Sequence, residues 1–286
     1  MRRSRKKRLV ERVVTYTLVV LLVSWILAPY GWLVVSSIST KETLISRPLK
    51  WVPERITLDR YLEILSPRSN NPVSKQFQRA LLNSSIVALI TTTVTVFFGT
   101  LSAYSISRYR FIGRKVLFVS LLASQMIPPV SLAIPLYAMF RNLNLIDRIP
   151  GLIMAFAAIT LPFISWILKN YFDTLPTDLE EAARIDGCTR FQALFKIVVP
   201  LSMPAITAAT IFAFIASWNE YFLALVLTTV DAKTMPVAVA EFSSKYGVDY
   251  LMISAGGVVA SLPPVLLALI FQKFVISGLT QGAVKG

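Results

Sequence analysis

The segment 169–199 holds nine charged residues between two long apolar stretches of the chain. Within it, Thr177 followed by Glu180 forms a capping-box pattern, in which each side chain accepts a hydrogen bond from the other residue's backbone N–H. A helix of about nine residues can then run to Asp186, with Gly187 at the position where a left-handed backbone is favoured. The pattern predicts a short helix that stops at a glycine.

A second capping box follows at Thr189 and Gln192 and predicts another helix, which ends before Pro200. The two helices predict a hairpin. Ala182 and Ala183 have almost no side chain, so this hairpin can lie flush against another protein. A surface hairpin that has no partner is the alternative.

A second group of candidate residues follows in the apolar sequence near position 220. It consists of Trp218, Asn219, Glu220 and Tyr221. An ionised carboxylate at membrane depth is costly, so Glu220 favours a functional role, such as lining a substrate path together with its neighbours. The alternatives are that Glu220 pairs with a Lys or Arg, or that water reaches it from the outer interface. Gln125 is a similar but weaker candidate.

Several kinds of chemistry are excluded by composition. The chain has no His and a single cysteine, Cys188, so it has no intrachain disulfide, no His-based catalytic triad and no Cys/His metal cluster. It also lacks the G-x-x-x-x-G-K-[ST] pattern of a phosphate-binding loop. The chain therefore cannot bind ATP in the usual manner of a P-loop protein.

The composition is that of a membrane protein. Of its 286 residues, 55% are hydrophobic and only 15% are charged, whereas soluble domains have about 25% charged residues. Six apolar windows come close to or exceed the roughly 20 residues that cross a bilayer, and in lipid such segments must be helical. These windows are residues 13–40, 80–107, 116–140, 149–168, 197–219 and 250–272.

The predicted fold is therefore all-α, a polytopic membrane protein with six transmembrane helices. We divide it into a basic N-terminus (1–12), a transmembrane domain (13–276) that includes the loop 169–203, and a tail (277–286). Prolines at 128, 129 and 135 and at 263 and 264 are expected to bend the third and sixth spans. Broken helices of this kind are frequent in transporters.

The net charge of +14 would favour nucleic-acid binding in a soluble protein, but here the basic residues follow membrane topology. Six of the first eight residues are Lys or Arg, and the loop 107–115 adds four more. The positive-inside rule places both segments in the cytoplasm, and six spans then place the C-terminus there as well. Segment 39–80 fits less well, because it has eight basic residues and must be external.

One pattern is specific enough to carry a resemblance. E-A-A, three residues, G, nine residues and I-x-x-P are present as Glu181, Ala182, Ala183, Gly187, Ile197 and Pro200. This run resembles the signature loop of the membrane subunits of binding-protein-dependent ABC importers. Val199 stands where that family usually has Leu. The C-terminal SGLTQGAVKG and the run WNEYFLALVLT resemble the MalG-like subunits of maltose-type sugar importers, and the resemblance covers nearly the whole chain.

The resemblance implies a permease bundle of the MetI/MalG-like type, whose loop is a coupling helix that docks on a cytoplasmic ATPase subunit. The implied coupling residues are Glu180, Glu181, Ala182, Ala183, Asp186, Gly187, Ile197 and Pro200. The implied tail contacts to the ATPase are Gly278, Leu279, Thr280, Gln281 and Gly282. The loop 230–250 is expected to face an external binding protein.

The same resemblance implies that this chain binds no cofactor and is not itself an enzyme, because the ATPase is a partner subunit. It also implies the partners and the location. They are a homologous permease subunit, two ATP-binding subunits that hold ATP and Mg, an extracytoplasmic solute-binding protein, a sugar and membrane lipid, with no nucleic acid. The location is a bacterial or archaeal cell membrane.

The substrate is a disaccharide or oligosaccharide, with glycerol phosphate or another polyol or glycoside as the alternative. Phosphate recognition needs Arg or Lys within the spans, and none is evident there, which favours a neutral sugar. An ion-coupled secondary transporter that uses Glu220 as its proton site is a further alternative, but such a carrier does not need the signature loop. A membrane-embedded hydrolase is disfavoured, because the chain has no His and no nucleophile–base pair.

Overall fold

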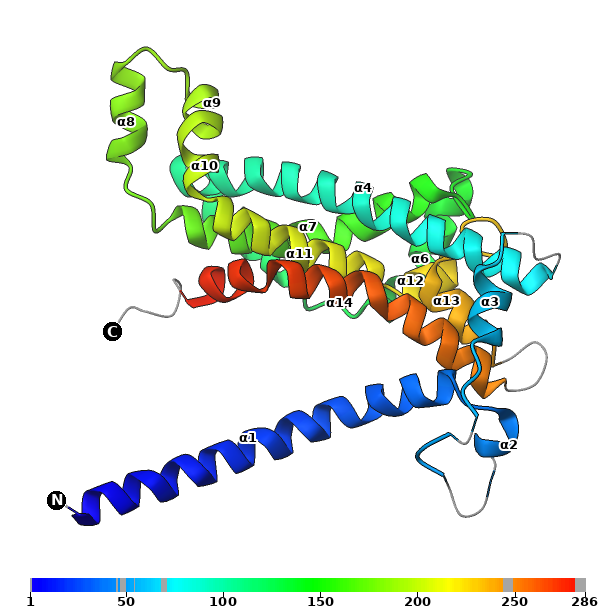
Figure 1. Ribbon diagram of the computed structural model, residues 1–286. Coiled ribbons are helices and arrows are strands. Elements are labelled where there is room, and N and C mark those ends of the chain that lie inside the picture. The colour runs from blue at the N-terminus through cyan, green and yellow to red at the C-terminus, as the bar shows by residue number, and fades with distance from the viewer. Residues whose placement is uncertain are drawn as a thin grey trace. The chain divides into compact units, whose positions relative to one another are not determined.

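The computed structural model describes residues 2–44, 46, 50–53, 55–67, 71–243 and 249–280, with side chains from residue 10 to residue 273 (Figure 1). All regular secondary structure in these ranges is helical, so the all-α prediction is confirmed. The helices up to residue 142 are α1 (Arg2–Ser37), α2 (Lys41–Leu44), α3 (Asp59–Leu65), α4 (Pro72–Arg108), α5 (Arg114–Ser124) and α6 (Pro129–Asn142). The later helices are α7 (Ile149–Phe172), α8 (Asp178–Ile185), α9 (Arg190–Ala193), the π-helix η1 (Leu194–Val198), α10 (Val199–Leu201), α11 (Met203–Trp218), α12 (Phe222–Leu227), α13 (Met235–Glu241) and α14 (Tyr250–Thr280).

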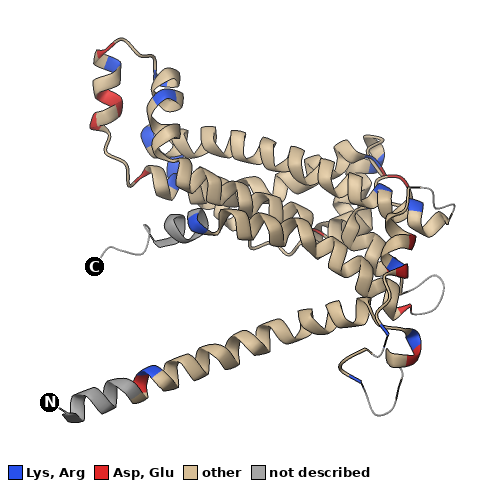
Figure 2. Cartoon of the chain, viewed as in Figure 1, with Lys and Arg blue, Asp and Glu red and all other residues tan. Residues whose placement is uncertain are grey.

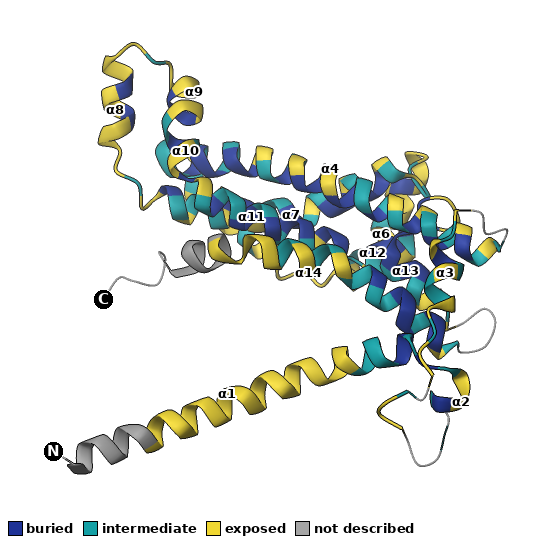
Figure 3. Cartoon of the chain, in the orientation of Figure 1, coloured by how far each residue is buried: buried dark blue, intermediate teal, exposed yellow. Residues whose placement is uncertain are grey.

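The chain forms two compact units. The first consists of Met1–Lys75 and Val239–Ala260, and the second of Gln76–Ala238 and Ser261–Gly286. In the first unit, the segment after α1 folds back onto the end of that helix. The Tyr61 hydroxyl lies 2.6 Å from the Ser37 hydroxyl, and the Trp32 and Trp51 rings meet edge to face at 5.0 Å. Residues 10–31 of α1 are exposed along their whole length (Figure 3).

Four helical segments in the described residues are long and apolar enough to cross a membrane, and the number rises to six if each of two bent helix pairs is one span. The four are Val10–Ser37, Pro72–Arg108, Ile149–Phe172 and Tyr250–Lys273. In one bent pair, Arg114–Ser124 and Pro129–Asn142, the chain bends by 98° between the two helices. In the other, Arg190–Leu201 and Met203–Trp218, the bend is 82°. The fold therefore agrees with the predicted bundle, although two predicted spans are not continuous helices.

The break in the predicted span 116–140 lies at residues 125–128. Pro128 has no N–H to donate and adopts an extended conformation (φ −62°, ψ 130°), and Pro129 then begins α6. A proline also disfavours helical geometry in the residue before it, so two successive prolines stop α5 and restart the chain in a new direction. Pro135 remains inside α6, and Pro263 and Pro264 remain inside α14. Only the first proline pair therefore ends a helix.

Small residues let the helices of the second unit approach one another closely. Ala205, Ala209 and Ala213 recur every four residues on α11 and are all buried in one cluster with Ile164 and Leu168 of α7. A stripe of alanine on one helix face lets two helix axes come close together. This cluster also contains Ala103 and Tyr104 of α4 and Leu194 and Val198 of η1. Helices α8 to α10 and the segments beside them form a hairpin, residues 173–202, which we call the 173–202 hairpin. The last turns of α4 are packed against its base.

A second buried cluster occupies the other end of α4 and joins it to α6, α7, α12 and α13. Its largest members are Phe140, Leu152, Phe156, Leu223 and Leu227. Residues 80–107 of α4 and the whole of α11 have no charged residue, and charges gather instead at helix ends and on α8 and α9 (Figure 2). This distribution is the one that an apolar bundle with polar ends requires.

At Gly151 the packing leaves no room for a side chain. A Cβ built on Gly151 would overlap the backbone carbonyl oxygen of Leu145, because the loop after α6 folds tightly onto the first turn of α7. At Gly99 a Cβ would meet a side-chain methyl of Ile164 at 2.9 Å, but no backbone atom closer than 3.5 Å.

We expect Gly151→Ala to lower the free energy of unfolding by about 1–3 kcal/mol, because a backbone carbonyl must shift. This loss occurs even though alanine is the better helix former. Melting temperatures in detergent measure it, with Gly99→Ala as the milder control. A Gly151→Ala protein as stable as the wild type would contradict this account of the loop.

Candidate functional site

The turn of the 173–202 hairpin has the predicted glycine geometry. Helix α8 ends with Asp186 as its cap, and Gly187 has φ +90°. The Cys188 N–H donates to the Ala183 carbonyl (2.9 Å) and the Gly187 N–H to the Arg184 carbonyl (3.1 Å). These two bonds form the Schellman motif, in which a left-handed residue ends a helix.

The second arm of the hairpin begins as predicted but continues further. Thr189 and Gln192 form the expected capping box, with backbone-to-side-chain bonds of 2.8 and 3.2 Å. The prediction that this helix ends before Pro200 is wrong, because it passes through the π-helix η1 and ends at Leu201. In η1 the Val199 N–H donates to Leu194. This wider turn makes room for the Pro200 ring, which would clash with a carbonyl in a regular α-helix.

The capping box predicted at Thr177 and Glu180 is not formed. Thr177 has helical backbone angles and its side chain makes no cap hydrogen bond. The Glu180 carboxylate instead accepts from Arg108 Nε (2.6 Å) and from the Tyr104 hydroxyl (2.8 Å), and Glu180 is only 8% exposed. We call Tyr104, Arg108 and Glu180 the Glu180 cluster. A buried carboxylate needs a charged partner, and losing one partner of such a pair typically costs about 3–5 kcal/mol, so the ion pair prevails over the cap.

The opposite side of the hairpin is exposed. Glu181, Ala182, Asp186 and Gly187 are all open to the surroundings, whereas Ala183 is buried at 5% exposure. Large apolar side chains are exposed beside them, and they are Leu179, Ile185, Phe191 and Phe195. Of the predicted coupling residues in the second arm, Pro200 is exposed and Ile197 is half-buried. An exposed apolar surface of this kind is typical of a protein-interaction site.

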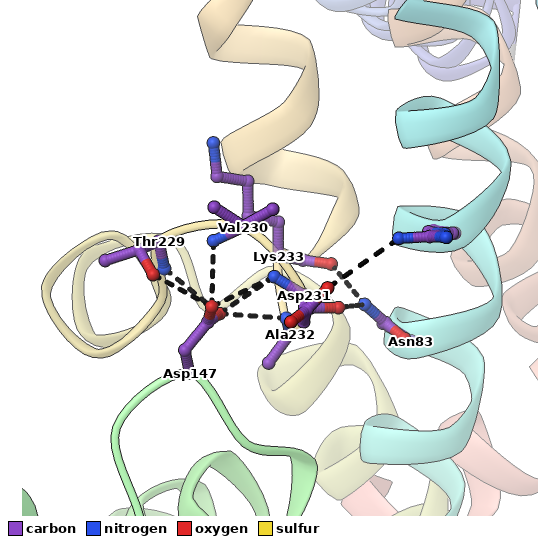
Figure 4. Close-up of polar contacts among 8 residues, drawn as sticks. Asn83, Asp147, Thr229, Val230, Asp231, Ala232 and Lys233 are labelled. Atoms are coloured by element: carbon purple, nitrogen blue, oxygen red, sulfur yellow. Dashed lines mark hydrogen bonds and ion pairs between the residues drawn. The ribbon is translucent and has the colours of Figure 1, made fainter. Parts of the chain in front are cut away.

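A site that sequence reasoning missed lies around Asp147, in the loop between α6 and α7 (Figure 4). Its carboxylate accepts backbone N–H bonds of 2.9–3.1 Å from residues 229–232 and a 2.8 Å bond from the Thr229 hydroxyl. Asp147 itself has φ +57°. Burial raises the pKa of Asp147, but the hydrogen bonds from Ala232, Asp231 and Thr229 outweigh it and hold that pKa well below its usual value.

Helix α4 holds the other side of the same loop. Asn83 Nδ2 donates to the carbonyls of Asp231 (2.8 Å) and Lys233 (3.0 Å), and the Met235 N–H donates to the Ser84 hydroxyl (2.7 Å). We call Asp147, Asn83, Ser84 and segment 229–235 the Asp147 loop site. Local sequence could not reveal it, because its partners are separated by about 80–150 positions in the chain.

The predicted substrate-path residues lie at the junction of α11 and α12. Trp218 is buried and stacks on Phe214, with ring centroids 5.7 Å apart. Glu220 is half-buried in the break between the two helices, and its carboxylate accepts the Leu223 N–H (2.9 Å) at the start of α12. Asn219 and Tyr221 are exposed. The structure thus gives Glu220 a capping partner, which the sequence reading did not consider.

Gln125 lies in the break between α5 and α6. Its Nε2 donates to the Ile159 carbonyl (2.8 Å), and it borders a largely apolar cavity of about 370 Å³ whose lining includes Met139, Met154 and Ile159. Residues 218–221 are not in the lining of this cavity. This cavity therefore does not bring Gln125 together with the Glu220 group.

The predicted tail contacts are only partly described. Gly278, Leu279 and Thr280 are the last residues of α14. Gln281 and Gly282 lie outside the described residues.

Comparison with known proteins identifies the family. A family model described as the inner membrane component of binding-protein-dependent transport systems matches residues 95–281. This range includes the whole hairpin and the loop that holds Asp147. The chain belongs to this family.

Relatives and solved structures agree with this assignment. The permease is 36% identical to the trehalose/maltose transport system permease protein MalG of Thermococcus litoralis, over 98% of this chain and 99% of that one. It is also 36% identical to the sulfoquinovosyl glycerol transport system permease protein SmoH of Agrobacterium fabrum, over 91% and 89%. A crystal structure of a bacterial ABC transporter that imports the polysaccharide alginate matches with a TM-score of 0.73 and 24% identity, over 91% of this chain and 95% of that one. The last match confirms the fold.

The Asp147 loop site gives a direct test of what holds the loop 229–235 of this permease. Hydrogen bonds to a charged group contribute roughly 1.5–3 kcal/mol, so we expect Asp147→Asn to cost about 2 kcal/mol and to speed amide exchange at residues 229–232. Asp231→Asn is the matched control, because its ion pair with Arg79 spans 3.7 Å between side chains that are 70% or more exposed. Such a pair contributes little.

The same site predicts a pH dependence. The folded pKa of Asp147 is lowered, so its contribution is fully present above the unfolded pKa of about 3.9 and is lost as the pH falls towards the folded value. We expect loop protection to fall below about pH 4 in the wild type but not in Asp147→Asn. Hydrogen exchange across this pH range measures it, and equal exchange in both proteins at pH 7 would refute the role of Asp147.

Proposed function

We propose that this permease is a membrane-spanning subunit of an ATP-driven importer that takes up a disaccharide or oligosaccharide. It forms the translocation path with a second, homologous permease chain. Two ATP-binding subunits hold ATP and Mg, and an extracytoplasmic solute-binding protein delivers the sugar. Family membership and the exposed face of the hairpin together support this proposal.

The hairpin is the observation that carries the proposal. The chain has no phosphate-binding loop of its own, and α8 offers an exposed surface on which an energy-supplying protein can dock. Glu181 is free to meet a basic group of the ATPase, and Ala182 allows close approach. The tail residues 278–282 are a further candidate contact with the ATPase.

The proposed orientation places both termini and the hairpin in the cytoplasm of a bacterial or archaeal cell. The basic N-terminus and the basic residues of 107–115 support it through the positive-inside rule. The loop 230–250 then lies outside, where the binding protein docks. The Asp147 loop site holds the first part of this loop in a fixed conformation.

The substrate class rests on the relatives. Their names span trehalose, maltose and sulfoquinovosyl glycerol, so a polyol or another glycoside is the alternative to a di- or oligosaccharide. Gln125 and residues 218–221 remain candidates for the substrate path. A panel of these sugars, tested for stimulation of ATP hydrolysis by the reconstituted complex, identifies the substrate.

Gly187 provides the test of ATPase coupling. A Cβ on Gly187 meets no atom within 4 Å, so the only obstacle to substitution is its φ of +90°. A β-branched residue is strained there by about 1–2 kcal/mol, which changes the angle between the arms of the hairpin. We expect Gly187→Val to insert normally but to retain about a tenth or less of the ATPase on co-purification, with sugar-stimulated hydrolysis falling in parallel.

Gly187→Asn is the matched control, because asparagine tolerates the left-handed conformation. It should keep most of the wild-type association and hydrolysis. Glu181→Ala should weaken association mildly, because it removes one charge and leaves the backbone unchanged. Wild-type sugar-stimulated hydrolysis in Gly187→Val would mean that this loop does not couple ATP to transport.

A further inference from the structure

Two neighbouring glutamates of α8 face opposite ways. Glu181 is exposed on the proposed docking face, whereas Glu180 is turned inward, and its side chain and that of Arg108 are each only 11% exposed. Glu180 therefore cannot contact a docked protein without breaking its bonds to Arg108 and Tyr104. Its role must differ from that of Glu181.

The last turn of α4 contacts every part of the hairpin base. Arg108 Nη2 donates to the Leu175 carbonyl (3.1 Å), so the same guanidinium holds both α8 and the linker before it. The Ser107 hydroxyl donates to Asp173 (2.6 Å), the residue that caps α7. On the other arm, Arg190 lies over the ring of Tyr109, the first residue after α4, at 4.9 Å. These contacts join α8, the linker and α9 to the end of α4 and the residue that follows it.

Within the hairpin, helix α8 packs against α9 and η1. Its buried residues are Glu180 and Ala183, and Glu180 makes the ion pair that joins α8 to Arg108 of α4. A displacement of α8 therefore acts on α4 through the Glu180 cluster more directly than through any apolar contact. A buried ion pair with an additional hydrogen bond fixes direction as well as distance, so α8 and the last turn of α4 move together.

Helix α4 carries that displacement to the far side of the second unit. From Arg108 to Asn83 is 25 residues, which is about 38 Å of continuous helix. At that end Asn83 and Ser84 hold the loop 231–235 of the Asp147 loop site. One unbroken helix thus links the hairpin to the loop that we expect to face the binding protein (Figure 1).

We propose that Glu180 and Arg108 are positioning residues that transmit the movement of α8 to α4, and that Glu180 is not a contact to the ATPase. This assignment rests on the proposed function, because it presumes that α8 docks on an ATPase. It replaces the expectation that Glu180 and Glu181 act alike. It also gives α4 the role of connecting the ATP-driven movement of α8 with the loop 229–235.

A double-mutant cycle in the reconstituted complex tests the proposal, with Glu180→Gln, Arg108→Gln and the double variant. Two quantities are measured, the amount of ATPase that co-purifies and the sugar imported per ATP hydrolysed. We expect Glu180→Gln to retain ATPase within about twofold while import per ATP falls about tenfold. The double variant should be no worse than either single one, because the two residues act as one unit. Arg110→Gln, which removes an exposed basic residue two positions further on, should behave as the wild type.

The outcomes separate this proposal from the proposed function. If the wild-type complex holds no ATPase, the proposed function fails. If the wild type is active and Glu180→Gln imports normally per ATP, or loses ATPase as Glu181→Ala does, the assignment of Glu180 is wrong. Additive losses in the double variant would also overturn it.

Tyr104→Phe covers the case in which the charge variants do not fold. It removes one hydrogen bond to Glu180 and leaves the ion pair in place, and we expect a two- to threefold loss of import per ATP with normal ATPase association. Unchanged import per ATP in Tyr104→Phe would overturn the proposal.

Discussion

A carboxylate that folding withdraws from water must find its partners within the protein. Glu180 meets this constraint with Arg108 and Tyr104, and Glu220 with the first turn of α12. Asp147 meets it with the backbone of residues 229–232. Each carboxylate binds a segment distant in sequence or restarts a helix, so these three side chains determine how the second unit is connected.

Helix α4 is the element that these connections share. One end holds the hairpin through the Glu180 cluster, and the other holds the loop 231–235 through Asn83 and Ser84. Residues 80–107 of this helix, 28 in all, carry no charge, and the helix packs against α7 through the close approach at Gly99. A helix that is charged only at its ends and continuous between them is suited to carry a displacement from one side of a membrane to the other.

Local signals predicted local structure well. The glycine turn at Gly187 and the capping box at Thr189 depend on residues within five positions of each other, and both are present. The box at Thr177 failed because Glu180 has a stronger partner more than 70 positions earlier in the chain. Asp147 was missed for the same reason. The bend at residues 125–128 was signalled by its prolines, but its angle of 98° depends on packing that no local pattern contains.

The claim that the hairpin docks on an ATPase is tested most directly by cross-linking in intact membranes. A photoreactive residue is placed at Ile185, which is 86% exposed at the end of α8, and a second at Trp25, which is 81% exposed on α1. The account predicts that the Ile185 probe cross-links to an ATP-binding subunit, identified by mass spectrometry, and that the Trp25 probe does not. An Ile185 probe that reaches lipid or other proteins but never an ATP-binding subunit would contradict it.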